Sequence, residues 1–125
     1  MRTVMISIRA RHLRDMREGR KLYELRKTRP NLTPPFRVLC CESGSGGEVK
    51  AAFICDACPE MTKKDTGVVA ALACIKPEEV RRYRGDGRLY GWRVKEFEDW
   101  AAVGRTRHVI DFGLKRPPQS WCYVE

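Results

Sequence analysis

A chain of 125 residues is long enough to enclose one hydrophobic core, so we expect a single domain over residues 1–125. Hydrophobic residues make up 42% and charged residues 33%, which excludes a disordered chain, and no apolar run approaches the roughly 20 residues that a membrane span needs. The net charge of +9 favours a polyanionic partner such as nucleic acid.

The first quarter of the chain changes from strand to helix and back to strand. Residues 4–8 predict a strand, and because they follow the N-terminus without a signal-peptide pattern, we expect a cytoplasmic protein with no membrane partner. Residues 10–18 predict an amphipathic helix. Gly19 suits a left-handed C-terminal cap, after which residues 21–27 predict a second strand.

The middle of the chain is a hairpin preceded by a proline-rich loop. Prolines make residues 29–35 a loop, and residues 36–42 predict a strand. The glycine-rich residues 43–47 form the hairpin turn before a strand over residues 49–56. That strand is apolar at both odd and even positions, so we expect it to be covered on both faces.

The last half of the chain adds two short helices and two strands. Residues 68–74 predict a short helix, and residues 77–84 a second one with proline in its first turn. Residues 89–98 predict one strand. Residues 104–118 are irregular, with a short turn near their middle, and residues 120–124 predict a terminal strand.

Strands therefore dominate, and no repeat, linker or low-complexity tract divides the chain. The fold class expected is α+β, mainly β. Short helices inserted between strands fit a small closed or nearly closed β-barrel with flanking helices, because closure removes the exposed edges of a sheet.

The six cysteines raise the question of a metal site. Cys55 and Cys58 have C-x-x-C spacing, but a tetrahedral zinc site needs two more ligands, and the chain has no second pair of this kind. The two histidines, His12 and His108, stand alone in the sequence. We therefore expect no metal and no cofactor, and no disulfides in an intracellular chain.

The strongest functional pattern is the run from Gly19 to Arg26, with the form G-x-K-x-x-E-x-R. Glu24 and Arg26 share one face of a strand, because side chains alternate with a period of two. Lys21 has the other parity and joins them only if the chain turns or bulges after Gly19. Two cations and a carboxylate would then converge, suited to phosphate oxygens and a base amino group. The alternative is a surface ion-pair ladder worth little energy.

This run resembles the signature of the ASCH domain family, a branch of the PUA-like small β-barrels. Further segments resemble the strands of that family in the same order: Ile6–Arg9, Glu48–Phe53 and Leu89–Trp92. The ending Arg116–Val124 resembles that of a bacterial and prophage subgroup. The resemblance covers nearly the whole chain and implies a PUA-like pseudobarrel that binds RNA or a nucleoside.

The charge distribution agrees with a site near the motif. Residues 1–37 hold 11 Lys or Arg against 3 acidic residues, a net +8, whereas residues 38–125 hold 14 against 13. Arg outnumbers Lys, and its planar guanidinium suits phosphate and bases. The residues expected to bind the ligand are Ser7, Arg9, Lys21, Glu24, Arg26, Trp92, Gln119, Ser120 and Trp121.

Several of these residues have a second interpretation. Arg9 extends the cationic cluster or is simply solvated. Trp92 stacks on a base or fills the core. Trp121, fixed in direction by the prolines before it, contacts a base or plugs the barrel mouth. Gln119 and Ser120 offer amide and hydroxyl contacts to a base edge.

Three functions follow as hypotheses. The first is a module that holds RNA or a nucleobase in a basic cleft. The second is a hydrolase with Lys21 and Glu24 as catalytic residues. Some ASCH-like enzymes deacetylate an acetylated cytidine with a threonine where this chain has Glu24, so that covalent route is disfavoured here. RNA cleavage by acid–base catalysis lacks a histidine within the motif. The third is a protein-interaction domain that uses its basic face.

Overall fold

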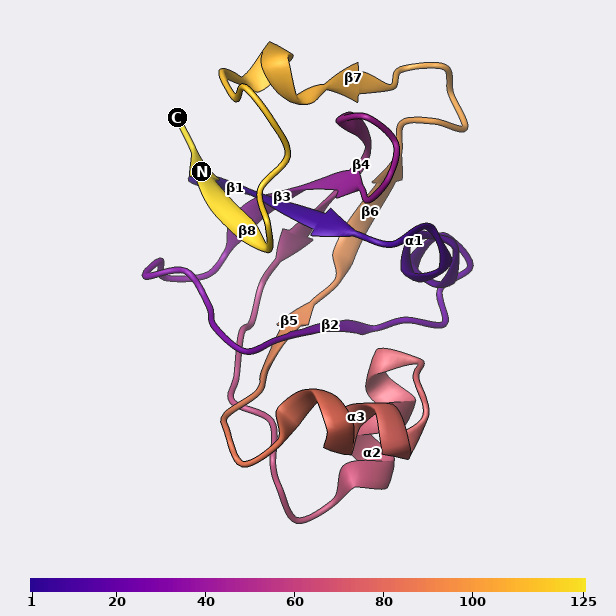
Figure 1. Cartoon of the computed structure of the whole chain (residues 1–125), viewed down its shortest axis with the longest axis vertical. Coiled ribbons are helices and arrows are strands. Elements are labelled where there is room, and N and C mark those ends of the chain that lie inside the picture. The colour runs from indigo at the N-terminus through magenta and orange to yellow at the C-terminus, as the bar shows by residue number, and fades with distance from the viewer.

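The computed structural model describes residues 1–125 and consists of two sheets, three α-helices and one 3₁₀ helix (Figure 1). The strands are β1 (Thr3–Ile8), β2 (Tyr23–Arg26), β3 (Phe36–Glu42), β4 (Glu48–Cys55), β5 (Tyr90–Arg93), β6 (Lys95–Asp99), β7 (Arg107–His108) and β8 (Trp121–Val124). The helices are α1 (Ala10–Arg17), α2 (Thr66–Ala73), α3 (Pro77–Arg84) and the 3₁₀ helix η1 (Val109–Phe112). No helix is both long and apolar enough to cross a bilayer.

The larger sheet has the strand order β6-β4-β3-β1-β8, with β7 also paired to β4. β1 runs parallel to β3 and antiparallel to β8, so the first and last strands of the chain are neighbours. β2 and β5 form a separate antiparallel pair, which Figure 1 shows between this sheet and helices α2 and α3. The mainly β, α+β class is confirmed. The pairing is a path with two ends, so it does not confirm closure of a barrel.

Most predicted elements are present close to their expected bounds, but the strand expected over residues 89–98 is two strands. β5 pairs with β2, whereas β6 pairs with β4 in the other sheet. Val94 lies between them, and its N–H donates to the carbonyl of Leu22 at 2.9 Å. The prediction of a single strand was wrong because the chain changes its pairing partner between Arg93, the last residue of β5, and Lys95, the first residue of β6.

The larger sheet is covered on both faces, as expected for β4. On one face, a core of 12 buried residues includes Val4, Ile6 and Phe53, with the fully buried Trp92 packed edge-on against Phe36. On the other face, a second core of six buried residues includes Val109, which η1 contributes as it covers the sheet. Helices α2 and α3 have a small core of their own. The strand alternation of the sequence therefore divides the interior into two layers.

The six cysteines are free thiols, and Cys40, Cys41 and Cys55 are buried. No three His, Cys, Asp or Glu side chains are grouped closely enough to hold a metal ion. Burial raises the pKa of the Cys41 thiol, so this cysteine is a neutral, apolar filler of the second core.

Gly19 turns the chain between α1 and β2. Its φ angle is +74°, in the left-handed region expected for the cap. The N–H groups of Arg20 and Lys21 then both donate to the carbonyl of Asp15, at 2.9 and 3.0 Å. The chain thus reverses before the strand begins at Tyr23, and Lys21 is freed from the strand's alternation.

Gly19→Ala should lower the free energy of unfolding by roughly 1–2 kcal/mol, because an L side chain is strained at this φ angle. Urea denaturation measures the change. Gly67→Ala is the matched control, since Gly67 lies in the first turn of α2 at ordinary φ and an added Cβ meets only ordinary contact there. Equal effects of the two substitutions would contradict the cap's role.

Candidate functional site

Lys21, Glu24 and Arg26, which we call the motif triad, converge, as expected if the chain turns after Gly19. The Lys21 Nζ lies 3.3 Å from Glu24 Oε1. Arg26 grips the other oxygen of the carboxylate, with Nε at 2.8 Å and Nη2 at 2.7 Å from Oε2. Glu24 and Arg26 share a face of β2, and the turn at Gly19 brings Lys21 beside them.

The cations of the triad also bind three carbonyl groups from distant parts of the chain. Arg26 Nη2 donates to the carbonyl of Ser7 at 2.7 Å, and Nη1 donates to the carbonyl and the hydroxyl of Ser120 at 3.1 and 3.2 Å. The Lys21 ammonium donates to the carbonyl of Ala73 at 2.7 Å. The triad therefore ties β2 to β1, to the start of β8 and to the end of α2.

The triad is buried, so the alternative of an exposed ion-pair ladder is wrong. Lys21, Glu24 and Arg26 are 3%, 6% and 8% exposed. Two cations surround one carboxylate, which leaves a net charge of +1 enclosed by protein. A buried charge without a counter-ion is unfavourable. This excess positive charge, partly offset by the carbonyl oxygens, distinguishes the triad from a neutral structural pair.

The pKa of Glu24 lies below its ordinary value. Burial by itself would raise this pKa, but the charges of Lys21 and Arg26 outweigh burial and hold the carboxyl ionised. A carboxylate held in this way is a strong acceptor and a weak base. It orients the two cations, and its affinity for a proton from a substrate is low.

His12 of α1 is a member of this neighbourhood that the sequence analysis missed. It lies close enough for burial first, and Lys21 next, to lower the pKa of its imidazole, so His12 is neutral at pH 7. Its Nδ1 atom is buried without a hydrogen-bond partner. The available signal was helical spacing, because His12 stands four residues before the inward-facing Met16.

The remaining candidates lie at the end of β1 and just before β8, and they differ in their contacts and their exposure. Ser7 contributes its carbonyl to Arg26, while its hydroxyl donates to the carbonyl of Pro118 at 2.5 Å. Arg9 is exposed at the start of α1, and Gln119 and Ser120 are exposed before β8. Their side chains are accessible, and only that of Ser120 contacts the triad.

The two tryptophans differ in access. Trp92 has no exposed surface, because it lies edge-on between Phe36 and Trp121, and its indole N–H donates to the carbonyl of Thr28 at 3.3 Å. The prediction that Trp92 contacts a ligand is therefore wrong, and the core interpretation is correct. Trp121 is half-buried and donates to the Thr28 hydroxyl at 2.8 Å.

Two cavities of the molecule are lined by residues other than the triad. One, of about 520 Å³, opens on the opposite face of the larger sheet. Another, of about 370 Å³, is formed by the loop at residues 29–34 together with Cys58. A ligand near the triad therefore meets its accessible border, above all Ser120, rather than the enclosed charges themselves.

Comparison with solved structures identifies the fold. The chain superposes on a serine-to-alanine variant of the ASCH protein from Zymomonas mobilis with a TM-score of 0.81 at 14% identity, covering 98% of this chain and 88% of that one. A tyrosine-to-phenylalanine variant gives 0.79 at 15% identity (100% and 91% coverage), and the ASCH structure without a named substitution gives 0.72 at 14% identity (98% and 87%).

The chain therefore has the fold of an ASCH domain, as its motif suggested. No protein-family model matches the sequence, and no curated protein is significantly similar to it. The likeness is one of fold, so the bacterial and prophage subgroup stays a prediction.

Arg26→Ala should lower the free energy of unfolding by about 3–5 kcal/mol, because it leaves a buried carboxylate with one partner fewer. Arg93→Ala is the control. Arg93 forms an equally short pair with Asp56, but its side chain is 39% exposed, and such pairs contribute about 0–1 kcal/mol. Chemical denaturation of both variants checks the difference, and similar losses would show that burial of the triad is energetically unimportant.

The triad should also make stability depend on acidic pH. The folded pKa of Glu24 is lowered, so its contribution is complete above the unfolded pKa of about 4.3 and is lost as pH falls through the folded value. The wild-type protein should exceed Glu24→Gln in stability at pH 7, and the difference should narrow below about pH 4. Denaturation over a pH series tests this, and a difference that stays constant down to pH 2 would contradict it.

Proposed function

We propose that this protein binds single-stranded RNA, or a nucleoside phosphate of the same chemistry, at the surface where β8 borders the motif triad. The observation that carries the proposal is the buried net charge of +1 formed by Lys21, Glu24 and Arg26. An anion placed nearby supplies the charge that this cluster lacks. The ASCH fold supports the same class of ligand, because the resemblance of this sequence to the ASCH family implies binding of RNA or a nucleoside.

Ser120 is the group through which the buried charge reaches the ligand. Its hydroxyl oxygen accepts a hydrogen bond from Arg26, which leaves the hydroxyl hydrogen free to donate outward. Ser120 is exposed, so a phosphate oxygen can accept this bond. Arg26 polarises the hydroxyl, and Glu24 and Lys21 hold Arg26 and the neighbouring backbone in place. The triad thus acts from below the surface while Ser120 makes the contact.

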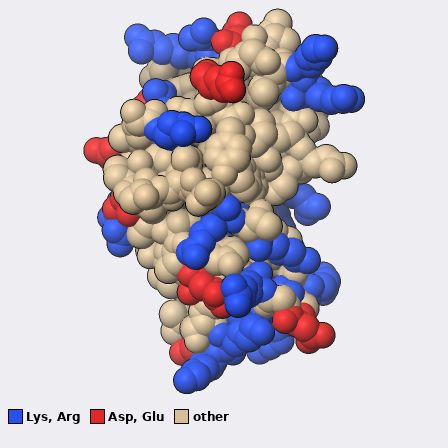
Figure 2. Space-filling view, turned by 90° about the vertical axis from the view of Figure 1, so that its left-hand side faces the viewer, with Lys and Arg blue, Asp and Glu red and all other residues tan.

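The neighbours of Ser120 supply base and backbone contacts in this proposal. Gln119 offers an amide to a base edge, and the accessible part of Trp121 offers a stacking surface. Arg9 adds an exposed cation at the start of α1. Figure 2 shows Lys and Arg gathered over the lower part of one face, toward the end of the molecule that holds α2 and α3. Such a surface suits the phosphates of a polyanion.

The hydrolase alternative receives no support from Glu24. A general base needs a pKa near the working pH, and the pKa of Glu24 is lowered by the cations that grip both of its oxygens. A threonine-type covalent route is likewise disfavoured, because a carboxylate occupies that place. Binding is the function that this arrangement fits best.

Ser120→Ala should weaken binding of a single-stranded RNA by roughly ten- to a hundredfold, since a hydrogen bond to a charged group contributes about 1.5–3 kcal/mol. Ser43→Ala is the control, because Ser43 is also exposed but lies in the hairpin turn before β4. Wild-type affinity should fall steeply with rising salt as phosphates release counterions. Fluorescence anisotropy at several salt concentrations measures both effects.

Two results would overturn the proposal. A salt-independent affinity would remove the electrostatic basis of binding. Equal RNA affinity of the Ser120→Ala and Ser43→Ala variants would show that RNA does not meet the triad through Ser120.

A further inference from the structure

A second candidate site lies on the opposite face of the larger sheet from the motif triad. The cavity of about 520 Å³ has a floor of neighbouring strand residues, in which Thr3 of β1 is paired with both Arg37 of β3 and Val124 of β8. Leu39 in this floor belongs to the second core, whereas Cys40, whose pKa is raised by burial and then by the charge of Glu24, belongs to the first. The sheet itself therefore separates the cavity from the triad.

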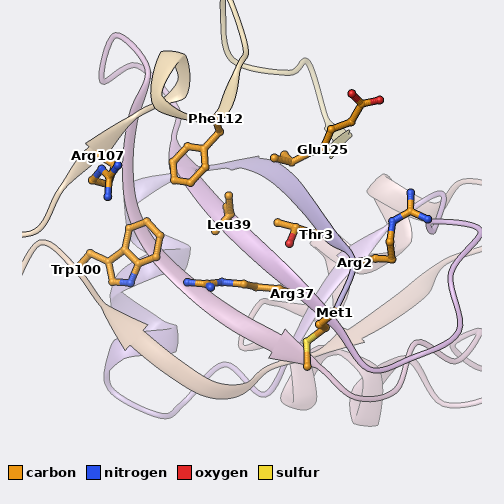
Figure 3. A pocket seen from close by; sticks show the side chains of 10 residues that line it. Met1, Arg2, Thr3, Arg37, Leu39, Trp100, Arg107, Phe112 and Glu125 are labelled. Carbon is orange, nitrogen blue, oxygen red and sulfur yellow. The ribbon is translucent and has the colours of Figure 1, made fainter.

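Two aromatic rings stand at one end of this cavity, as Figure 3 shows. Trp100 follows β6, and Phe112 ends η1. Their rings are nearly parallel, at 21°, with centroids 6.4 Å apart. Both are half-buried, because they pack against the second core while part of their surface lines the cavity. Flat, partly exposed rings of this kind are stacking surfaces for a nucleobase.

A guanidinium group accompanies each ring. The guanidinium of Arg37 lies 5.7 Å from the ring centre of Trp100, and that of Arg107 lies 5.9 Å from the ring centre of Phe112. Guanidinium groups beside aromatic rings combine two contacts that a nucleotide needs, a planar surface for the base and paired N–H donors for the phosphate.

These arginines are only loosely paired with carboxylates. Arg37 lies 3.9 Å from Glu98, and Arg107 lies 3.5 Å from Asp111, whereas Arg93 and Asp56 are joined by two hydrogen bonds of 2.7 Å. Loose, exposed pairs are weak and are readily exchanged for a better anion. Among the lining residues three are arginines and only Glu125 is acidic. Figure 3 places Glu125 at the end of the cavity away from the rings.

We propose that this cavity binds a nucleotide, with its base against Trp100 and Phe112 and its phosphate held by Arg37 and Arg107. A volume of about 520 Å³ is within the range of small-molecule sites, roughly 300–1,000 Å³. An acidic peptide would satisfy the arginines and leave the paired rings unused, whereas a nucleotide uses both. The site uses none of the residues that bind RNA in the function proposed above.

The test is a titration of ¹⁵N-labelled protein with uridine monophosphate, followed by amide chemical shifts. The shifts should concentrate near Leu39, Trp100 and Phe112. Phe112→Leu keeps an apolar side chain but removes the ring, and it should weaken binding by about tenfold or more. Arg107→Gln should weaken it similarly by removing a charge-assisted contact.

Arg88→Gln is the matched control, because Arg88 is also exposed and loosely paired, 3.9 Å from Glu60, but lies outside the cavity. The affinity of the Arg88→Gln variant for uridine monophosphate should equal that of the wild type. A short oligouridine forms the second arm. Tighter binding of the oligomer with the same sensitivity to Phe112→Leu assigns the site to an RNA strand, and equal binding assigns it to free nucleotides.

The proposal is overturned if uridine monophosphate shifts no amide around the cavity, if Phe112→Leu binds as the wild type does, or if Arg88→Gln weakens binding as much as Arg107→Gln. Ser120→Ala separates the two sites. If RNA binding depends on Ser120 but no amide around the cavity shifts on titration, only the proposal of this second site is wrong.

Discussion

The carboxylate of Glu24, held between two cations inside the protein, is the interaction on which the arrangement of this molecule depends. Its oxygens fix Lys21 and Arg26, and those cations bind carbonyl groups of Ser7, Ala73 and Ser120. Elements far apart in the sequence thus converge on one charged group. Removal of one partner leaves the others buried and unbalanced, so the cluster has to be assembled as a unit.

This requirement explains why a short strand has so large an effect on the fold. β2 has only four residues and pairs with β5 outside the larger sheet, so its backbone hydrogen bonds alone give it little hold on β1 and β8. The side chain of Arg26 provides that hold, and Glu24 on the same face of β2 fixes Arg26 in place. Lys21 does the same for the end of α2. The same contacts leave an uncompensated positive charge next to an exposed hydroxyl, so the architecture and the proposed anion binding have one origin.

The sequence was sufficient to predict the structural features that depend on residues close together in the chain. The period of two placed Glu24 and Arg26 together, the glycine at residue 19 indicated the turn that brings in Lys21, and proline marked the start of α3. Burial of the triad was not predictable, because the carbonyl that receives Lys21 is 52 residues away in the chain. The division of residues 89–98 into two strands likewise follows from partners on separate sheets.

The same limit applies to His12 and to the cavity on the far face. His12 approaches Lys21 only because the chain turns at Gly19, so its helical spacing with Met16 indicates an inward position but not Lys21 as its neighbour. The cavity joins β1 and β3 to residues around β6, β7 and η1, whose order in the sequence gives no sign that their side chains meet. For Trp92 the sequence suggested a contact that the fold removes: this aromatic residue is suited to stacking on a base, but it is fully buried in the core.

The pairing of the first strand with the last has a consequence for the order in which the protein matures. β8 joins β1 through residues more than one hundred positions apart, and the N–H of Ser7 donates to the carbonyl of Ser120 at 2.9 Å. Contacts of such long sequence separation form late, because closing the intervening loop is entropically unfavourable. During synthesis on the ribosome, the motif emerges early but its exposed border is absent until β8 docks. In the function proposed above, a nascent chain therefore cannot bind RNA at this border until its folding is nearly finished.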